Sequence, residues 1–334
     1  MSPLTARASN LIRLIPALGL VLLLIPGSPA ASESERPTIG IALGGGGARG
    51  MAHIGVLARL EELRVPVDCV SGTSMGAVVG AYTALGFTPA EIERMALAAD
   101  WSLLIPDRPD RRGLSFRRKT DSFDNIWPFE FGITGHGLGL QRGFLSNQRF
   151  NYIWSEPDLY TAGYDGFDAL PVPFRPVATD LETGESVVLE KGNLLRAVQA
   201  SMAAIGAFPP VRLDGRDLTD GYLRAMVPVD AARGMGADKV IAVHVGWNPG
   251  ELPPSGAWDL VTISMQAGYI LTWANVEPDM AQADVSLYIS LPEVPLFDLT
   301  QAENGIAAGR AAVDAQLDAL ERPGLSDEGG AAGR

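Results

Sequence analysis

The sequence predicts an α/β protein, a three-layer α/β/α sandwich with a mainly parallel central sheet. Short apolar runs alternate along the chain with longer segments whose apolar residues recur at helical spacing. The short runs are apolar on both faces, as strands are when helices cover both sides of a parallel sheet. Two of these runs end in glycine-bearing turns that open directly into a predicted helix. This alternation predicts strand–helix–strand units rather than hairpins.

The predicted elements follow one another without an internal repeat or a long linker. Strands are expected at 38–43, 66–70, 174–179, 186–189, 239–245 and 285–290, and helices at 49–63, 75–85, 89–98, 194–203, 228–235, 260–272 and 305–320. A further short strand is expected to end at Asp220. The stretch 107–144 is rich in arginine, glycine and aromatic residues and is predicted to be an irregular insertion or cap.

The two ends of the chain are expected to lie outside the fold. Arg7 and Arg13 give a positive start, and the apolar run 14–25 is too short to span a bilayer comfortably as a helix. Ser28-Pro29-Ala30 then fits a small-x-small cleavage site. Residues 1–30 are therefore predicted to be a signal peptide, with an uncleaved anchor as the alternative, and the protein is expected to be periplasmic or secreted. One domain would cover 31–322, followed by a disordered tail, 323–334.

Charge and cysteine content restrict the classes of function. The formal net charge is −13 at pH 7, which argues against nucleic-acid binding and against broad attraction to anionic membranes. Cys69 is the only cysteine in the chain, so no internal disulfide can form and stability must come from the core.

Two glycine-bearing turns carry the strongest chemical signal. In the loop 44–50, GGGGARG, several backbone N–H groups converge on one point, which suits negative charge. The turn 72–76, GTSMG, fits the G-x-S-x-G nucleophile elbow, in which Gly72 and Gly76 permit a tight turn that exposes the Ser74 hydroxyl. An anion cradle beside an exposed serine is what acyl transfer requires. The two turns together predict a serine hydrolase.

The glycine loop has a competing interpretation. Gly45, Gly47 and Gly50 also satisfy G-x-G-x-x-G, the fingerprint of a dinucleotide-binding oxidoreductase. That site needs an acidic residue at the end of the next strand, about 20 residues on, to hold the ribose. Here Asp68 lies inside the next strand, and the end of that strand is occupied by the serine elbow. The nucleotide interpretation is therefore disfavoured.

A serine hydroxyl is a weak nucleophile and needs a base, for which the chain offers two candidates. His244 follows a carboxylate in chain order and is the one histidine that suits a triad, since His53 is expected to make a structural hydrogen bond and His136 lies in the insertion. Asp220 stands at a strand end and is followed by glycine, at the sheet edge where open α/β folds assemble sites. The residues alone leave the choice open.

Taken together, the loop 45–50, the elbow 72–76 and the pair Asp220-Gly221 resemble the three signatures of the patatin-like phospholipases. The similarity extends through 52–57, 177–184, 200–201 and 208–210, and covers roughly 37–320. The resemblance implies the patatin-like α/β/α fold and a Ser–Asp dyad in place of a triad. Ser74 would attack the ester carbonyl, Asp220 would take its proton, and water would hydrolyse the acyl-enzyme.

The resemblance also implies the remaining parts of the site. Substrates would be phospholipids or other lipid esters, as for a phospholipase A or lysophospholipase-type esterase, with transient contact to a membrane surface and with no cofactor or metal. The oxyanion hole would consist of the backbone N–H groups of Gly45, Gly46 and Gly47, with Arg49 fixing the loop.

Two departures from the family pattern concern the turn after Asp220. The family usually continues with Gly or Ala two residues after the aspartate and with Asn three residues later, where this chain has Tyr222 and Ala225. Ile205-Gly206 stands where the family often has Pro-Gly. These departures keep open the alternative of a catalytically weak patatin-fold protein that binds lipid.

A basic cluster occurs within the predicted insertion. Aromatic residues flank it, so it is a candidate headgroup contact in which arginine binds phosphate. The alternative is a solvated loop with internal salt bridges. The arginines of this candidate contact are Arg111, Arg112, Arg117 and Arg118.

Overall fold

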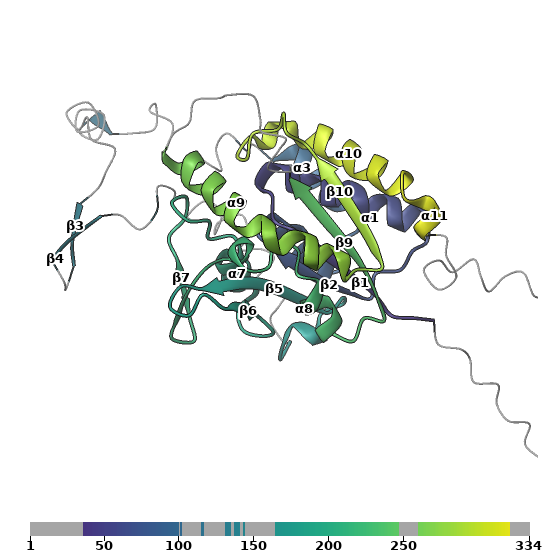
Figure 1. Cartoon of the computed structure of the whole chain (residues 1–334), viewed down its shortest axis with the longest axis horizontal. Coiled ribbons are helices and arrows are strands. Elements are labelled where there is room, and N and C mark those ends of the chain that lie inside the picture. The colour runs from purple at the N-terminus through teal and green to yellow at the C-terminus, as the bar shows by residue number, and fades with distance from the viewer. Residues whose placement is uncertain are drawn as a thin grey trace, which may run out of the picture. The chain divides into compact units, whose positions relative to one another are not determined.

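An eight-stranded sheet lies at the centre of the unit that begins at Pro37 (Figure 1). The computed structural model describes residues 36–99, 101, 115–116, 131–134, 137–140, 143, 164–246 and 260–320. The strand order is β10-β9-β1-β2-β5-β8-β7, with β6 paired to β5. The strands are β1 (Ile39–Leu43), β2 (Cys69–Thr73), β5 (Phe174–Asp180), β6 (Ser186–Val188), β7 (Val211–Leu213), β8 (Arg216–Asp220), β9 (Lys239–Gly246) and β10 (Val285–Ser290).

The predicted mainly parallel sheet is confirmed, with an antiparallel edge. The pairs β10–β9, β9–β1, β1–β2 and β2–β5 are parallel, whereas β6, β7 and β8 join antiparallel. The register at β5 matters for the site, because Val177 pairs with Thr73 of β2 while the next residue, Ala178, pairs with Asp220 of β8. Consecutive residues of β5 therefore bring the ends of β2 and β8 together.

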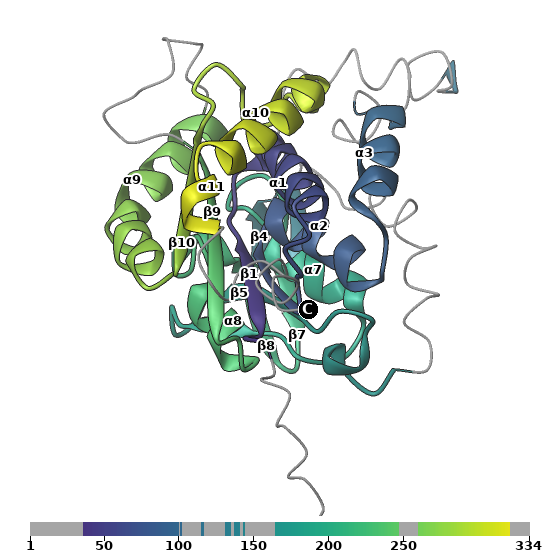
Figure 2. The same cartoon turned by 90° about the vertical axis from the view of Figure 1, so that its right-hand side faces the viewer.

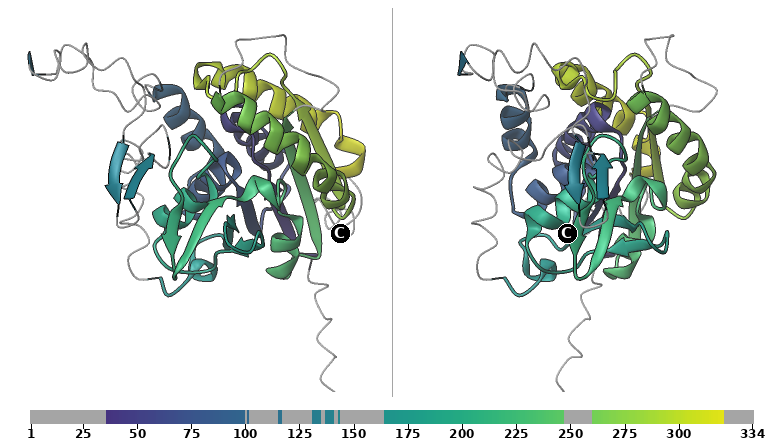
Figure 3. Two further views of the ribbon diagram at one scale, coloured as in Figure 1. Left: turned by 60° about the vertical axis from the view of Figure 1, so that its left-hand side comes forward. Right: turned by 90° about the vertical axis from the view of Figure 1, so that its left-hand side faces the viewer.

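Helices cover both faces of the sheet, which gives the predicted three layers. The core on one face joins the sheet to α1 (Ala52–Glu62), α2 (Met75–Ala84), α3 (Pro89–Ala98), α7 (Leu194–Ser201) and α10 (Ala302–Asp314). The core on the other face joins it to α8 (Val229–Gly234) and α9 (Leu260–Ala281). Figure 2 shows α9 on the opposite side of the strands from α1 and α2, and Figure 3 shows the same layers from the other side.

Local sequence accounts for where several helices begin. Thr88 caps α3 in a capping box with Glu91, and Pro89 occupies the first helical position, where its missing N–H costs nothing. The Asn193 side chain caps α7 by accepting a hydrogen bond from the Arg196 N–H at 2.8 Å.

Some element boundaries differ from the prediction for identifiable reasons. The second strand runs over 69–73 rather than 66–70, because its polar residues Ser71 and Thr73 are buried and donate to the carbonyls of Pro228 and Ala225 at 2.7 Å each. Helix α9 extends nine residues beyond its predicted end at 272. The predicted helix 305–320 is two helices, α10 and the short α11 (Leu317–Leu320).

The prediction of an irregular insertion over 107–144 was wrong for a short part of it. Two strands, β3 (Phe131–Thr134) and β4 (Gly137–Leu140), pair antiparallel as a separate sheet. Glycines at 132, 137 and 139 hide the strand pattern, because glycine has low strand propensity. The rest of the insertion lies largely outside the described residues, as do the predicted signal peptide and tail. No helix within the described ranges has the length and apolar character needed to cross a membrane.

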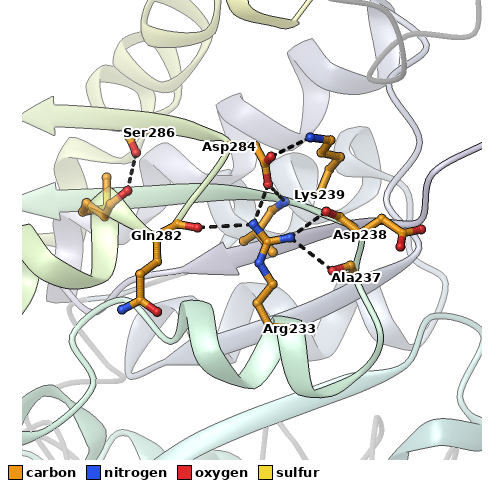
Figure 4. A network of polar contacts seen from close by, with 9 residues as sticks. Arg233, Ala237, Asp238, Lys239, Gln282, Asp284 and Ser286 are labelled. Atoms are coloured by element: carbon orange, nitrogen blue, oxygen red, sulfur yellow. Dashed lines mark hydrogen bonds and ion pairs between the residues drawn. The ribbon is translucent and has the colours of Figure 1, made fainter.

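A polar network joins α8 and the residues after α9 to β9 and the start of β10 (Figure 4). The Asp284 carboxylate accepts hydrogen bonds from the Arg233 guanidinium at 2.6 Å, the Lys239 ammonium at 2.8 Å and the Val240 backbone N–H at 2.9 Å. Arg233 also donates to the carbonyls of Ala237 and Asp238, and to that of Gln282 just after α9. One carboxylate thus holds the end of α8 and the start of β9 against a segment more than 40 residues further along the chain.

Replacing Asp284 with alanine is expected to lower the free energy of unfolding by about 2–3 kcal/mol, since the Val240 N–H and the Arg233 guanidinium lose their shared acceptor. Urea unfolding at pH 7 measures this change. Burial opposes ionisation of Asp284, but the bonds from Lys239, Val240 and Arg233 lower its pKa below the ordinary 3.8. Its contribution is thus complete above about pH 4 and lost as the pH falls through the lowered pKa.

The matched control is Asp314→Ala, which removes a carboxylate that is half exposed and paired with Arg59. A surface pair of this kind contributes less than about 1 kcal/mol. Equal losses of unfolding free energy in the two variants would contradict the special role of the Asp284 network.

Candidate active site

Ser74 occupies the turn between β2 and α2 in a backbone conformation that few non-glycine residues adopt. Its φ is 54° and its ψ is −121°. Gly76 makes the turn feasible, since a Cβ at this position would lie 2.1 Å from the carbonyl oxygen of Leu43 in β1. Gly72 is equally confined, because its Cβ would lie 2.5 Å from the Gly76 carbonyl oxygen. The strand, turn and helix are those of a nucleophile elbow.

Asp220 ends β8 and is almost fully buried beside this turn. Its backbone is held on both sides, since its N–H donates to the Ala203 carbonyl at 3.1 Å and its own carbonyl accepts from the Thr179 hydroxyl at 3.0 Å. The carboxylate accepts a hydrogen bond from the Tyr222 N–H at 3.0 Å, and the Ser74 side chain lies close enough to lower its pKa. The structure therefore brings the two predicted dyad residues together.

Burial determines the ionisation of Asp220. Desolvation raises the pKa of this carboxyl to about 7, against the opposing effect of the Tyr222 N–H and the Ser74 side chain. A carboxylate with a pKa near neutrality is suited to act as a general base at physiological pH.

The departures at Tyr222 and Ala225 leave the Asp220 turn intact. Residue 222 serves Asp220 through its backbone N–H, and the tyrosine ring packs in the core against Val276, Met280 and neighbouring residues. Residue 225 serves through its backbone carbonyl, which accepts from the Thr73 hydroxyl at 2.7 Å. Because both contacts use main-chain atoms, the side chains at 222 and 225 can change without moving the aspartate.

The glycine loop lies directly beside Ser74. A Cβ on Gly45 would lie 3.3 Å from the Ser74 Cβ. The Gly45 N–H donates to the Met226 carbonyl at 3.0 Å, so the expectation that it faces an oxyanion is wrong in this structure. The N–H groups of Gly46 and Gly47 have no hydrogen-bond partner among the described residues. The oxyanion candidates are thus reduced from three donors to two.

Arg49 and Gly47 connect the glycine loop to the segment that follows β10. The Arg49 side chain is buried, and its Nε donates to the Leu291 carbonyl at 3.2 Å. Gly47 has a φ of +56°, and a Cβ there would lie 2.3 Å from the Leu296 carbonyl oxygen, which accepts from the Ala48 N–H at 2.7 Å. The Arg49 contact is of the kind expected for a residue that fixes the loop.

Of the two described histidines, His53 contacts the glycine loop. His53 Nε2 lies 2.8 Å from the Gly44 carbonyl oxygen, and since a carbonyl only accepts, this nitrogen carries the proton. His244, in β9, is two strands from β2 in the sheet and packs its ring against Trp273 and Tyr288. Burial lowers the pKa of each imidazole to about 4. The side chain that Ser74 influences is the Asp220 carboxyl, whose pKa it lowers.

Several other candidates cannot be placed. Arg111, Arg112, Arg117 and Arg118 of the basic cluster lie outside the described residues, as does His136. Within the described ranges, no three His, Cys, Asp or Glu side chains gather in a way that could hold a metal ion.

Sequence reasoning assigned no role to Ser201, the last residue of α7. Its buried hydroxyl accepts a hydrogen bond from the Ser74 N–H at 3.0 Å. The only sequence signal was its place in the segment 200–201 that resembles the family, which gives no indication of a partner 127 residues away.

The fold and this site place a serine in a strand–turn–helix elbow next to a buried carboxylate. The profile of the patatin-like phospholipases matches residues 41–233, more than half of the chain and inclusive of Ser74 and Asp220. The chain belongs to the patatin-like phospholipase family.

Comparison with individual proteins agrees with this assignment. Patatin-like phospholipase domain-containing protein 6 of Mus musculus is 31% identical over 244 residues, which cover 72% of this chain and 15% of that protein. An uncharacterized NTE family protein of Mycobacterium tuberculosis is 34% identical over 221 residues, which cover 65% of this chain and 52% of that protein. The chain thus spans between about a seventh and a half of these relatives.

Among solved structures, VipD from Legionella pneumophila matches with 14% identity and a TM-score of 0.42, over 85% of this chain and 67% of VipD. The type III effector ExoU of Pseudomonas aeruginosa matches with 15% identity and a TM-score of 0.41, over 85% of this chain and 53% of ExoU.

Reaction of Ser74 with a fluorophosphonate is expected to accelerate as the pH rises through about 7, since Asp220 accepts the hydroxyl proton only as a carboxylate. The second-order rate constant of labelling, measured from pH 5 to 9, gives the midpoint. A midpoint near pH 4 would contradict the raised pKa. Asp279→Asn is the control, because burial also raises the pKa of Asp279, to about 6, and the midpoint should not change.

Proposed function

We propose that this protein hydrolyses acyl esters of lipids, in the manner of a phospholipase A or lysophospholipase, with Ser74 as nucleophile and Asp220 as base. The observation that carries the proposal is the position of Ser74, in its strained elbow, beside a buried carboxyl whose pKa is raised to about 7. Membership of the patatin-like phospholipase family supports the lipid ester as the substrate class.

The proposed reaction has two stages, acylation of Ser74 and hydrolysis of the acyl-enzyme. Asp220 accepts the proton of the Ser74 hydroxyl as the serine oxygen attacks the ester carbonyl, and the N–H groups of Gly46 and Gly47 donate to the developing oxyanion. Asp220 then gives the proton to the departing alcohol, which leaves an acyl group on Ser74. Water attacks this ester with Asp220 again as base, and the Ser74 oxygen recovers its proton as the fatty acid departs.

Helix α9 offers a surface that suits lipid. A Cβ on its Gly268 would lie 2.6 Å from the Tyr222 hydroxyl, so the helix packs on the turn that follows Asp220. No charged residue occurs between 260 and 276, while Ile263, Ile270 and Leu271 are exposed. In a chain of net charge −13, an uncharged apolar face is complementary to a neutral or zwitterionic lipid surface rather than an anionic one. We include contact of α9 with such a surface in the proposal.

Ser74→Ala is expected to abolish hydrolysis of a soluble p-nitrophenyl ester, and Asp220→Asn to lower kcat at least a hundredfold, because an amide cannot accept the proton. Steady-state kinetics at pH 8 measure both. Asp279→Asn is the matched control, since it removes another carboxylate of raised pKa on α9 and should retain activity.

The outcomes separate the alternatives. Near-normal hydrolysis by Asp220→Asn together with a strong loss in His244→Ala would replace the dyad with a triad. Binding of lipid by the wild type without turnover would identify the catalytically weak lipid-binding protein. A rise of the thermal midpoint with NAD would favour the dinucleotide interpretation.

Leu271→Glu is expected to reduce hydrolysis of phosphatidylcholine vesicles about tenfold or more and to leave the soluble ester unaffected. Leu271 is 80% exposed, and the lipid contact of one leucine is worth about 1.5–3 kcal/mol, or roughly tenfold to a hundredfold in binding. Rates on the two substrates give the comparison. Leu181→Glu, at an exposed leucine after β5, is the control, and equal losses in both variants would exclude α9 as the contact surface.

A further inference from the structure

The hydroxyl of Ser201 makes two hydrogen bonds in a fully buried position. It accepts from the Ser74 backbone N–H at 3.0 Å and donates to the Val177 carbonyl at 2.6 Å. A serine hydroxyl has one proton, so these two bonds together fix its orientation. The Ser74 peptide is thereby joined to β5 through a single side chain.

The same turn of the chain also holds the other member of the dyad. Two residues after Ser201, the Ala203 carbonyl accepts from the Asp220 N–H at 3.1 Å and from the Thr219 hydroxyl at 2.7 Å. Ser74 follows β2, and Asp220 ends β8. These two strands are not neighbours, because β5 lies between them. The segment 201–203 therefore contacts the main chain of both residues from one end of α7.

The Ser201 bond acts where the backbone is strained. A non-glycine residue at the φ and ψ of Ser74 persists only when its surroundings enforce it. The Ser74 peptide can rotate toward a relaxed conformation only if its N–H leaves the Ser201 oxygen. Rotation of this kind moves the Ser74 hydroxyl away from the Asp220 carboxylate.

We propose that Ser201 is a positioning residue that holds the Ser74 backbone in its strained conformation and, through the turn 201–203, sets the separation between Ser74 and Asp220. This inference rests on the proposed function of the dyad. In this inference Ser201 neither contacts the substrate nor transfers a proton. It controls only the position of the Ser74 hydroxyl.

The test uses the graded series Ser201, Ser201→Cys and Ser201→Ala in the full chain. Cysteine is somewhat larger and is a weaker donor and acceptor, and alanine removes both bonds. We expect kcat for a soluble ester to fall in this order, by roughly tenfold to a hundredfold in the alanine variant, with KM little changed. The rate of fluorophosphonate labelling of Ser74 should fall in parallel.

Ser71→Ala is the matched control. Ser71 is also fully buried, three residues before Ser74, and its hydroxyl donates to the Pro228 carbonyl at 2.7 Å without contact to the Ser74 peptide. Thermal midpoints should fall in both alanine variants, whereas kcat should fall only in Ser201→Ala. If Ser201→Ala does not fold, kcat is compared between Ser201→Cys and Ser71→Cys, and it should fall only in Ser201→Cys.

A pH profile distinguishes positioning from a general loss of structure. The Ser74 side chain lowers the pKa of Asp220, so displacement of the Ser74 hydroxyl raises that pKa and moves the acid limb of kcat/KM to higher pH. A loss of stability alone leaves the pH of the acid limb of kcat/KM unchanged.

Activity within threefold of wild type and an unmoved acid limb in Ser201→Ala would overturn the inference, as would an equal loss of kcat in Ser71→Ala. If the wild type neither reacts with the probe nor hydrolyses esters, it is the proposed function that fails. The crystal structure of Ser201→Ala then decides the inference: a Ser74 φ that leaves the positive region supports it, and a retained φ and Asp220 contact overturn it.

Discussion

The backbone conformation of Ser74 is the constraint around which the rest of the site is organised. A positive φ at a serine costs on the order of 1–3 kcal/mol, and several segments converge to maintain it. Gly76 lets α2 pack against the end of β1, Ser201 holds the Ser74 N–H, and the Thr73 hydroxyl binds the Ala225 carbonyl beyond the Asp220 turn. Each of these contacts uses a main-chain atom on at least one side, so the geometry of the nucleophile depends on how strands and turns are placed.

The burial of Asp220 favours chemistry at the expense of stability. Desolvation raises its pKa to about 7, so between about pH 4 and pH 7 the folded chain binds a proton that the unfolded chain has released. The stability contributed by the neutral carboxyl is complete below the unfolded pKa and is lost as the pH rises through 7. Above that pH the fold carries a buried charge that is stabilised mainly by the Tyr222 N–H and the Ser74 hydroxyl. The form that can accept a proton is therefore also the less stable one.

The sequence predicted the parts of this molecule that depend on local pattern. The apolar runs at 38–43, 239–245 and 285–290 are β1, β9 and β10 to within a residue. β1 and β9 are buried on both faces and therefore show continuous apolar character, whereas the edge strand β10 alternates between buried and exposed residues. Motif spacing identified Ser74 and Asp220 as candidates. Contacts between distant segments were not accessible: no local signal shows that the Gly45 N–H binds Met226 or that Ser201 reaches Ser74. β2 was displaced in the prediction because its polar residues are satisfied by carbonyls more than 150 residues away.

Because Leu291 and Leu296 anchor the glycine loop, the site can form only late during synthesis of the chain. β1 pairs with β9, and the loop that follows β1 is bound by carbonyls about 240 residues further along the chain. Helix α1 then packs on α10 so closely that a Cβ on Gly309 would lie 2.0 Å from the Ala52 carbonyl oxygen. The ribosome adds roughly 5–20 residues per second, so the first functional segment to be synthesised waits many seconds for its partners. The candidate site is assembled only when nearly the whole polypeptide has been synthesised, and a truncated translation product contains Ser74 without the loop in place.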